Sequence, residues 1–162
     1  MFGKKRSAVL VPGTKAPSFE LPNVNGSSQS ANAILGAGPA VFVFFKTGCP
    51  VCQMTMPFLE RLTGQSGLQI FAISQDDRTS TQKFNDRFGI TFPTLLDEAK
   101  AGYPVSSAFG ITSVPSIFVV EPDGIISTAF AGFSKRELQA LGDRIGRRPF
   151  QPDEKVPEFR AG

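Results

Sequence analysis

The chain has 162 residues, of which 41% are hydrophobic and 19% are charged, a composition that indicates one globular domain and excludes a disordered chain. It carries 17 lysine and arginine residues against 14 aspartate and glutamate residues, and Lys4, Lys5 and Arg6 alone account for the net charge of +3. The other side chains therefore balance at 14 positive and 14 negative, so we expect no nucleic-acid partner.

The numbers of histidine and cysteine residues and the length of the longest apolar run exclude further classes of protein. Histidine is absent, which excludes Ser-His and Cys-His nucleophile pairs and histidine-ligated metal sites. The two cysteines, Cys49 and Cys52, are too few for a disulfide framework. The longest apolar run, residues 40–45, is far shorter than the roughly 20 residues of a membrane span, so we expect no transmembrane segment.

The first part of the chain predicts a flexible leader over residues 1–12 and a short strand over residues 18–21. Asn25-Gly26 marks a tight turn. The continuous run of β-branched and aromatic side chains at residues 40–45 predicts a strand that is buried on both faces.

A helix is predicted immediately after this strand, over residues 50–62. Met54, Phe58 and Leu62 recur at spacings of four and are expected to form its apolar stripe. Pro57 lies inside the helix and predicts a kink, because proline has no backbone N–H to donate to the preceding turn.

The second half of the chain alternates between predicted strands and helices. Thr79 with Gln82, and later Ser134 with Glu137, have the spacing of capping boxes that begin helices. Gly89 is expected to end the first of these two helices. The predicted strands cover residues 68–73, 92–96, 116–120 and 125–131, and the predicted helices cover residues 79–88, 103–109 and 134–145.

The order of these elements indicates an α/β fold with one central mixed β-sheet and helices on both of its faces. Pro122-Asp123-Gly124 predicts the turn of a terminal hairpin. We expect the domain to cover residues 13–146. The proline-rich and charged residues 147–162 are expected to form a flexible tail.

The chemistry is expected at the CxxC motif formed by residues 49–52, which lies where the buried strand ends and a helix begins. A sulfur at a helix N-terminus faces unpaired N–H groups and the positive end of the helix dipole, and both favour the thiolate. The spacing places Cys52 about one turn beyond Cys49, close enough for a disulfide. We therefore expect Cys49 to attack a target disulfide and Cys52 to resolve the mixed disulfide.

Two other interpretations of the cysteine pair remain open from the residues alone. A CxxC pair can supply half of a zinc site, but this chain has no other cysteine and no histidine to complete it, so the metal would bridge two chains. Free cysteines are also often ordinary core residues. The position between a strand and a helix favours a redox dithiol over both, and we expect neither a metal nor a cofactor.

Residues 44–57 resemble the active-site segment of the thioredoxin superfamily, most closely its TlpA/ResA-like and redoxin (AhpC/TSA-related) branch. Members of this branch have a proline in the helix eight residues after the first cysteine, and this chain has Pro57 there. They also have a cis-proline in a loop that faces the dithiol, and Val114-Pro115 matches it. The resemblance covers residues 13–146 and implies a thioredoxin-like fold.

The resemblance also implies a role for this loop in substrate binding. A cis bond before Pro115 turns the Val114 backbone outward, where its N–H and C=O pair with an extended substrate segment, while the ring of Pro115 shields the thiols. From the residues alone, a trans proline that starts a strand is an equal alternative.

Three more residues are candidates for supporting the dithiol: Lys46, Pro50 and Thr55. Lys46 adds positive potential near the thiolate, or it is simply a solvated charge. The resemblance places a glutamate at the position of Thr55 in TlpA/ResA-like proteins, and an aspartate at the position of Val43 in thioredoxins. This chain therefore lacks both of the usual proton acceptors for Cys52.

The predicted function is thiol–disulfide oxidoreduction on protein disulfides, with an upstream thiol reductant that recharges the dithiol. The alternative enzyme is a peroxiredoxin-like thiol peroxidase, whose Pro-x-x-x-Thr-x-x-Cys pattern needs proline and threonine where this chain has Phe42 and Lys46. A third possibility is a thioredoxin-fold module that binds a metal or a protein without catalysis. We expect a monomer.

The cytoplasm is the expected location, because the chain has only two cysteines and no secretory signal follows the basic residues 4–6. A periplasmic or exported protein is the alternative if a leader has been removed.

Overall fold

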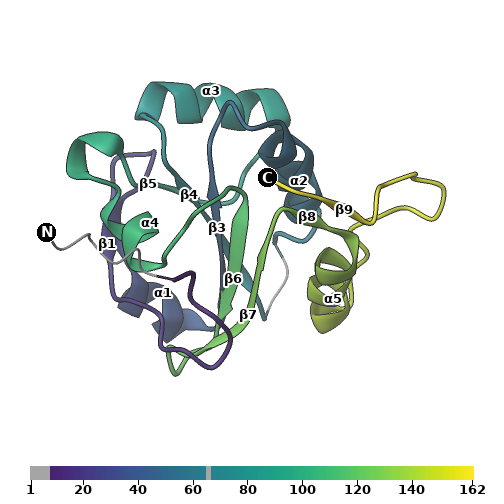
Figure 1. The fold of residues 1–162 in the computed structure, drawn as a ribbon, viewed down its shortest axis with the longest axis horizontal. Helices are drawn as coiled ribbons and strands as arrows, with labels where there is room; N and C mark the ends of the chain where they lie inside the picture. The colour runs from purple at the N-terminus through teal and green to yellow at the C-terminus, as the bar shows by residue number, and fades with distance from the viewer. Residues whose placement is uncertain (1–7, 65–66) are drawn as a thin grey trace, which may run out of the picture.

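The computed structural model describes residues 8–64 and 67–162, which fold as a central β-sheet between two layers of helices (Figure 1). The sheet has the strand order β5-β4-β3-β6-β7, and it is mixed because β3 pairs parallel with β4 but antiparallel with β6. The predicted α/β class with helices on both faces is confirmed. The strands are β3 (Ala40–Phe45), β4 (Gln69–Ser74), β5 (Thr94–Leu96), β6 (Ser116–Val120) and β7 (Ile126–Ala131).

Strand β3 lies at the centre of this sheet, and all of its side chains are buried. Successive side chains of a strand point to opposite faces, so β3 contributes to both layers of the core. Its bounds and its burial on both faces agree with the prediction for residues 40–45. Val41, Val43 and Phe45 pack into the first core, and Ala40, Phe42 and Phe44 pack into the second.

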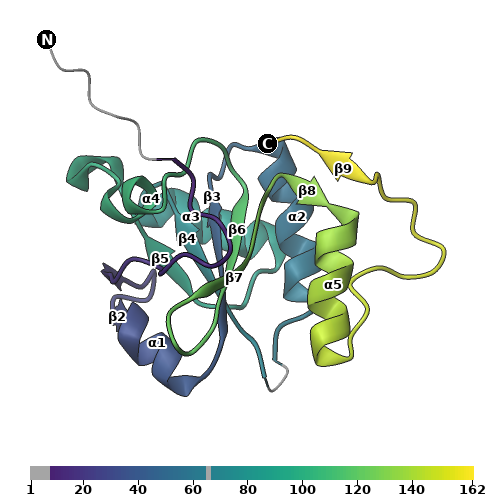
Figure 2. The ribbon, with the colours of Figure 1, turned by 60° about the horizontal axis from the view of Figure 1, so that its bottom comes forward.

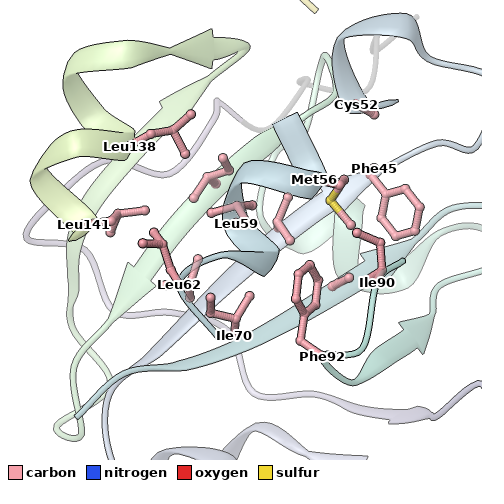
Figure 3. Packing of buried hydrophobic residues seen from close by; sticks show 14 of the residues in the cluster. Phe45, Cys52, Met56, Leu59, Leu62, Ile70, Ile90, Phe92, Leu138 and Leu141 are labelled. Atoms are coloured by element: carbon pink, nitrogen blue, oxygen red, sulfur yellow. The ribbon is translucent and has the colours of Figure 1, made fainter. Parts of the chain in front are cut away.

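The first core lies between the sheet and the helices α2 (Pro50–Glu60), α3 (Arg78–Phe88) and α5 (Lys135–Ile145). Figure 3 shows the part of it where side chains of α2 and α5 meet the sheet. The fully buried residues of α2 follow the pattern i, i+3, i+4 and i+7 and therefore share one face of the helix. They are Cys52, Thr55, Met56 and Leu59.

The apolar stripe predicted for this helix is only partly correct. Leu62 is buried, but Met54 and Phe58 are half-buried at the border of the first core. Phe58 lies there because it packs against Phe133 and Phe150, which come from distant parts of the chain. Spacing along a helix does not reveal such neighbours.

The second core lies on the opposite face of the sheet, under helix α1 (Ala31–Ala37) and helix α4 (Pro104–Ala108) (Figure 2). Ile34 and Val105 are the buried apolar residues that these helices contribute to it. The strand predicted over residues 18–21 corresponds to β1 (Glu20–Pro22). Helix α1, the strand β2 (Ser28–Ser30) and the 3₁₀ turn η1 (Ala99–Ala101) were not predicted, because each has too few residues for a clear periodic pattern.

The C-terminal ends predicted for the helices over residues 79–88 and 134–145 are correct, as is one of the two predicted caps. The helix predicted over residues 50–62 ends earlier, at Glu60. Gly89 and Gly146 end α3 and α5 with φ of 66° and 69°, in the left-handed region that glycine adopts without strain. Ser134 caps α5 by accepting the N–H of Glu137 at 3.2 Å. The predicted cap at Thr79 is wrong, because the carboxylate of Asp77 takes that place two residues earlier and accepts the N–H of Ser80 at 2.8 Å.

Residues 147–162 make defined contacts with the domain, although their composition predicts a flexible tail. Phe150 is buried in the first core, with its ring centroid 4.9 Å from that of Phe58. Arg61 donates two hydrogen bonds of 2.6 and 3.0 Å to Glu154. Strand β9 (Phe159–Arg160) then pairs antiparallel with β8 (Phe133–Ser134).

The opposite end of the chain is described from residue 8 onward, so the basic residues 4–6 of the predicted leader lie outside the described residues. Leu10 is anchored by its N–H, which donates to the Phe109 carbonyl at 3.1 Å. The assignment of a leader and a tail on either side of residues 13–146 stays a prediction. Within the described ranges, none of the helices has the length and hydropathy needed to cross a membrane.

A bidentate ion pair joins the end of β6 to α5, and it gives a testable pH dependence. Arg144 donates to the two carboxylate oxygens of Glu121 at 2.7 and 2.8 Å, and these bonds lower the pKa of Glu121 to about 2. A glutamate in an unfolded chain has a pKa of about 4.3. The pair therefore stabilises the fold above pH 4.3, and this contribution is lost as the pH falls toward 2.

We predict that Arg144→Ala lowers the free energy of unfolding at pH 7 by about 1 kcal/mol, the upper range for a partly exposed pair. Urea denaturation at pH 7, 5 and 2 should show this difference shrinking as the pH falls. Arg136→Ala is the matched control, because Arg136 is 87% exposed in its pair with Glu137. A difference for Arg144→Ala that is the same at pH 2 and pH 7 would contradict the prediction.

Candidate active site

Cys49 follows the buried strand β3 after three intervening residues and forms the N-cap of α2. Its backbone is extended (φ −85°, ψ 115°), and its Sγ accepts the N–H of Cys52 at 3.2 Å. Pro50 follows as the first residue of the helix, where the missing N–H of proline leaves no backbone partner unsatisfied. The half-buried sulfur thus faces the positive end of a helix dipole, which stabilises a thiolate.

Cys52 lies one turn further along α2 and has no exposed surface. Burial raises the pKa of this thiol well above its ordinary value, and a hydrogen bond with the Cys49 thiol raises it further. A backbone hydrogen bond with Lys46 acts in the opposite direction but is smaller. Both cysteines are free, so the structure shows the reduced dithiol with a protonated inner thiol.

The loop before β6 faces the dithiol, as the resemblance predicts, and the peptide bond between Val114 and Pro115 is cis. The Cys49 thiol donates to the Val114 carbonyl, with 3.5 Å between Sγ and the oxygen. The Pro115 carbonyl is occupied by the N–H of Gly132 at 2.8 Å, and Ser116 Oγ donates to the Ser113 carbonyl at 2.7 Å. These bonds fix the loop between β6 and the end of β7.

The other predicted residues differ in their relation to the thiols. Lys46 is exposed and lines a cavity of about 260 Å³ together with Val114, Gln75 and Tyr103. Thr55 is fully buried, and its hydroxyl donates to the Val51 carbonyl at 2.7 Å. Thr55 is therefore bonded within its own helix, and it supplies no carboxylate to the inner thiol.

Asp76, a carboxylate that the sequence analysis did not single out, lies beside the dithiol loop. The N–H and the hydroxyl of Thr47 donate to its Oδ2 at 2.7 and 2.9 Å. Its negative charge also contributes to the raised pKa of Cys52. One sequence signal was available: Asp76 follows β4, which runs parallel to β3, so both strands deliver their next residues to the same edge of the sheet.

Metal ligands are not gathered elsewhere in the parts of the chain that the structure describes: no group of three or more cysteine, aspartate or glutamate side chains forms a cluster able to hold an ion. The chemistry that the described residues place together is that of a dithiol at a helix N-terminus.

Comparison with known proteins agrees with this geometry. The sequence model of the AhpC/TSA family matches residues 12–129. The chain belongs to the AhpC/TSA family. Thiol-disulfide oxidoreductase ResA of Halalkalibacterium halodurans is 33% identical to it over 139 residues, which cover 82% of this chain and 76% of that protein. The predicted resemblance to the ResA-like and redoxin branch is therefore confirmed.

Solved structures confirm the thioredoxin-like fold of this AhpC/TSA member. The thioredoxin domain of a thiol-disulfide oxidoreductase from Bacteroides vulgatus matches with a TM-score of 0.68 at 22% identity, covering 76% of this chain and 91% of that one. The peroxidoxin BcpB from Mycobacterium tuberculosis matches with a TM-score of 0.69 at 22% identity, covering 84% and 94%. At this sequence identity the two matches establish the fold but not the reaction, which has to be inferred from the residues of the site.

The unequal burial of the two sulfurs gives a prediction about their reactivity. At pH 7 iodoacetamide should label the reduced protein once, on Cys49. Cys52 should react at least about 100-fold more slowly, because its thiol is buried and protonated. Mass spectrometry of tryptic peptides measures both rates. Labelling in urea should be equal at the two positions, and equal labelling of the folded protein would contradict the assignment.

The position of Thr55 gives a second prediction, on the glutamate that the resemblance leads one to expect there. Burial should raise the pKa of a glutamate at this position above its unfolded value of about 4.3. The variant Thr55→Glu should therefore lose stability as the pH rises above 4.3, by about 2 kcal/mol for a pKa shift of roughly 1.5 units.

Thr55→Val is the control for this experiment, because it removes only the hydrogen bond to Val51 and should cost about 1 kcal/mol at every pH. Urea denaturation from pH 4 to pH 8 measures both variants. A Thr55→Glu protein whose stability does not change over this range would show that the new carboxylate reaches water.

Proposed function

We propose that Cys49 is the attacking thiol and Cys52 the resolving thiol of a thiol–disulfide oxidoreductase that acts on protein disulfides. The observation that carries the proposal is the difference between the two sulfurs: Cys49 is half-buried and caps α2, whereas Cys52 is fully buried with a raised pKa. The relative ResA, 33% identical, supports the same reaction class.

The reaction begins with the Cys49 thiolate, which attacks one sulfur of the substrate disulfide. That disulfide breaks, its second sulfur leaves as a thiolate and takes a proton, and a mixed disulfide joins Cys49 to the substrate. Cys52 then loses its proton and attacks the Cys49 sulfur, which releases the second substrate thiol. Two electrons and two protons pass from the dithiol to the substrate, and an upstream thiol reductant returns them.

The order of these steps follows from the causes of the raised pKa of Cys52. Both the hydrogen bond with Cys49 and the charge on Cys49 raise that pKa in the reduced protein. In the mixed disulfide the Cys49 sulfur has no negative charge and is a weaker acceptor for the Cys52 thiol, so both of these contributions decrease. Cys52 thus becomes a better nucleophile only after the first step, which protects the reduced dithiol from reacting at the wrong sulfur.

Val114 and Pro115 form the proposed substrate-binding edge. The Val114 carbonyl lies 3.5 Å from the attacking sulfur, which is where the backbone next to a substrate cysteine has to run. An extended segment that pairs with this backbone would present its disulfide to Cys49. Lys46 is proposed as a supporting positive charge, because it is exposed on the loop between β3 and α2 that carries Cys49, and it lines the cavity beside Val114.

The peroxidase alternative has less support from the site. The positions where a peroxiredoxin pattern needs proline and threonine are occupied by Phe42, which is buried in the second core, and by the exposed Lys46. The protein is proposed to work as a monomer, since one chain supplies every residue of this mechanism. The proposed location is the cytoplasm, where a reduced dithiol acts as a donor.

The proposal is tested by removing the resolving sulfur. Cys52→Ser should accumulate a mixed disulfide through Cys49 when it is mixed with a disulfide-linked protein, and its turnover should fall about 100-fold or more because the second step is lost. Non-reducing gels and mass spectrometry identify the adduct. Cys49→Ser is the control and should form no adduct. Turnover of Cys52→Ser at the rate of the parent protein would exclude the two-thiol mechanism.

A further inference from the structure

The end of the described chain lies against the proposed substrate-binding edge. Figures 1 and 2 both show β9 running past β8 toward the end of α2 where the helix begins. β8 and β9 pair antiparallel, with Phe133 opposite Arg160 and Ser134 opposite Phe159. The chain thus returns from the far side of α5 to the place where Cys49 is held.

The contact at the end of this segment is between backbones. A methyl group added to Gly162 would lie 1.8 Å from the Val114 carbonyl oxygen, 2.6 Å from its carbonyl carbon and 3.1 Å from Cδ of Pro115. No side chain fits in that space, so Gly162 rests directly on the peptide between Val114 and Pro115. The same Val114 oxygen accepts the hydrogen bond from the Cys49 thiol.

Main-chain contacts hold the path of the segment at several points before Gly162. The N–H of Lys135 donates to the Glu158 carbonyl at 3.0 Å. Further on, a methyl group at Gly132 would lie 2.4 Å from the Arg160 carbonyl oxygen, so Gly132 leaves room for the close approach of β9. Gly132 also binds the Pro115 carbonyl through its N–H, which connects this path to the cis-proline loop.

The side chains of β9 nevertheless contribute little to binding the segment. Phe159 is 53% exposed, and both residues of β9 are exposed on the surface of the described protein. A two-residue strand without a buried side chain contributes little to stability and can leave its position without unfolding the domain. The segment therefore contacts the edge through its backbone as a bound extended peptide would. Because it buries no side chain in β9, it is held weakly enough to be displaced.

We propose that residues 159–162 occupy the binding edge at Val114 as an intramolecular ligand, which a protein substrate has to displace before its disulfide reaches Cys49. The competitor is taken to be a disulfide-containing protein, and this part of the inference rests on the proposed function. That the edge at Val114 is occupied rests on the contacts of Gly162 alone. Tethering gives the segment an effective concentration in the millimolar range, so that weak backbone contacts are enough to compete.

Removing the segment should therefore improve catalysis for substrates that need the edge. The apparent affinity of a site falls by the fraction of molecules in which it is free, so a segment that is bound nine-tenths of the time weakens substrate binding about tenfold. A chain that ends at Glu158 should show kcat/KM about tenfold higher for the symmetrical disulfide of the peptide Gly-Ala-Cys-Ala-Gly, through KM with kcat unchanged. Hydroxyethyl disulfide, which has no peptide backbone, should react at nearly the same rate with both proteins.

Gly162→Ala is the second variant, because its methyl group has no space beside Val114 and should expel the segment without shortening the chain. Gly36→Ala is the matched control, since a methyl group there meets no atom within 4 Å. Thermal unfolding followed by circular dichroism shows whether the variants keep the fold. An unchanged KM for the peptide disulfide in both the shortened chain and Gly162→Ala would overturn the proposal.

A binding measurement separates this proposal from the proposed function. A synthetic peptide of residues 156–162 should slow the reaction of iodoacetamide with Cys49 in the shortened chain, and should have little effect on the parent protein, whose edge is already occupied. Protection of Cys49 in a protein that turns over no disulfide would support the occupied edge and reject the oxidoreductase function. Absence of protection together with normal turnover would reject the occupied edge alone.

Discussion

The hydrogen bond from the N–H of Cys52 to Sγ of Cys49 is the interaction on which the site depends. It follows from the path of the chain, because β3 is buried on both faces and ends at Phe45, and α2 begins at Pro50 with Cys49 as its N-cap. Thr47 reinforces this position through its two hydrogen bonds to Asp76, beyond the neighbouring strand β4. A sulfur atom thus does the work that serine or aspartate does at an ordinary helix cap.

The two thiols owe their different chemistry to the same helix. Cys49 precedes α2 and meets its unpaired N–H groups, while Cys52 is on the face that packs into the first core with Met56 and Leu59. The N-terminus of the helix therefore presents its positive dipole end to Cys49, while its buried face excludes water from the Cys52 thiol. No separate base is needed to make the sulfurs unequal, which fits the position of Thr55, whose hydroxyl is bonded within the helix.

The sequence predicts the parts of this arrangement that depend on neighbouring residues, and misses those that depend on distant ones. The bounds of β3 and β6, the cap at Ser134 and the CxxC motif at the start of α2 follow from local patterns. Asp76 is brought to Thr47 by the pairing of two parallel strands, which no local pattern contains. Residues 147–162 look disordered by composition, yet the single aromatic side chain of Phe150 anchors them in the first core.

The Val114 carbonyl has a different partner in each state of the proposed cycle, and this links the dithiol to the binding edge. The neutral Cys49 thiol donates its proton to that oxygen at 3.5 Å. The thiolate has no proton to donate, and its charge repels the negative end of the carbonyl dipole. Ionisation of Cys49 therefore removes the thiol proton from this oxygen, which can then accept an N–H from a backbone that displaces residues 159–162. The charge that makes Cys49 reactive also prepares the neighbouring peptide to bind the chain that carries the disulfide.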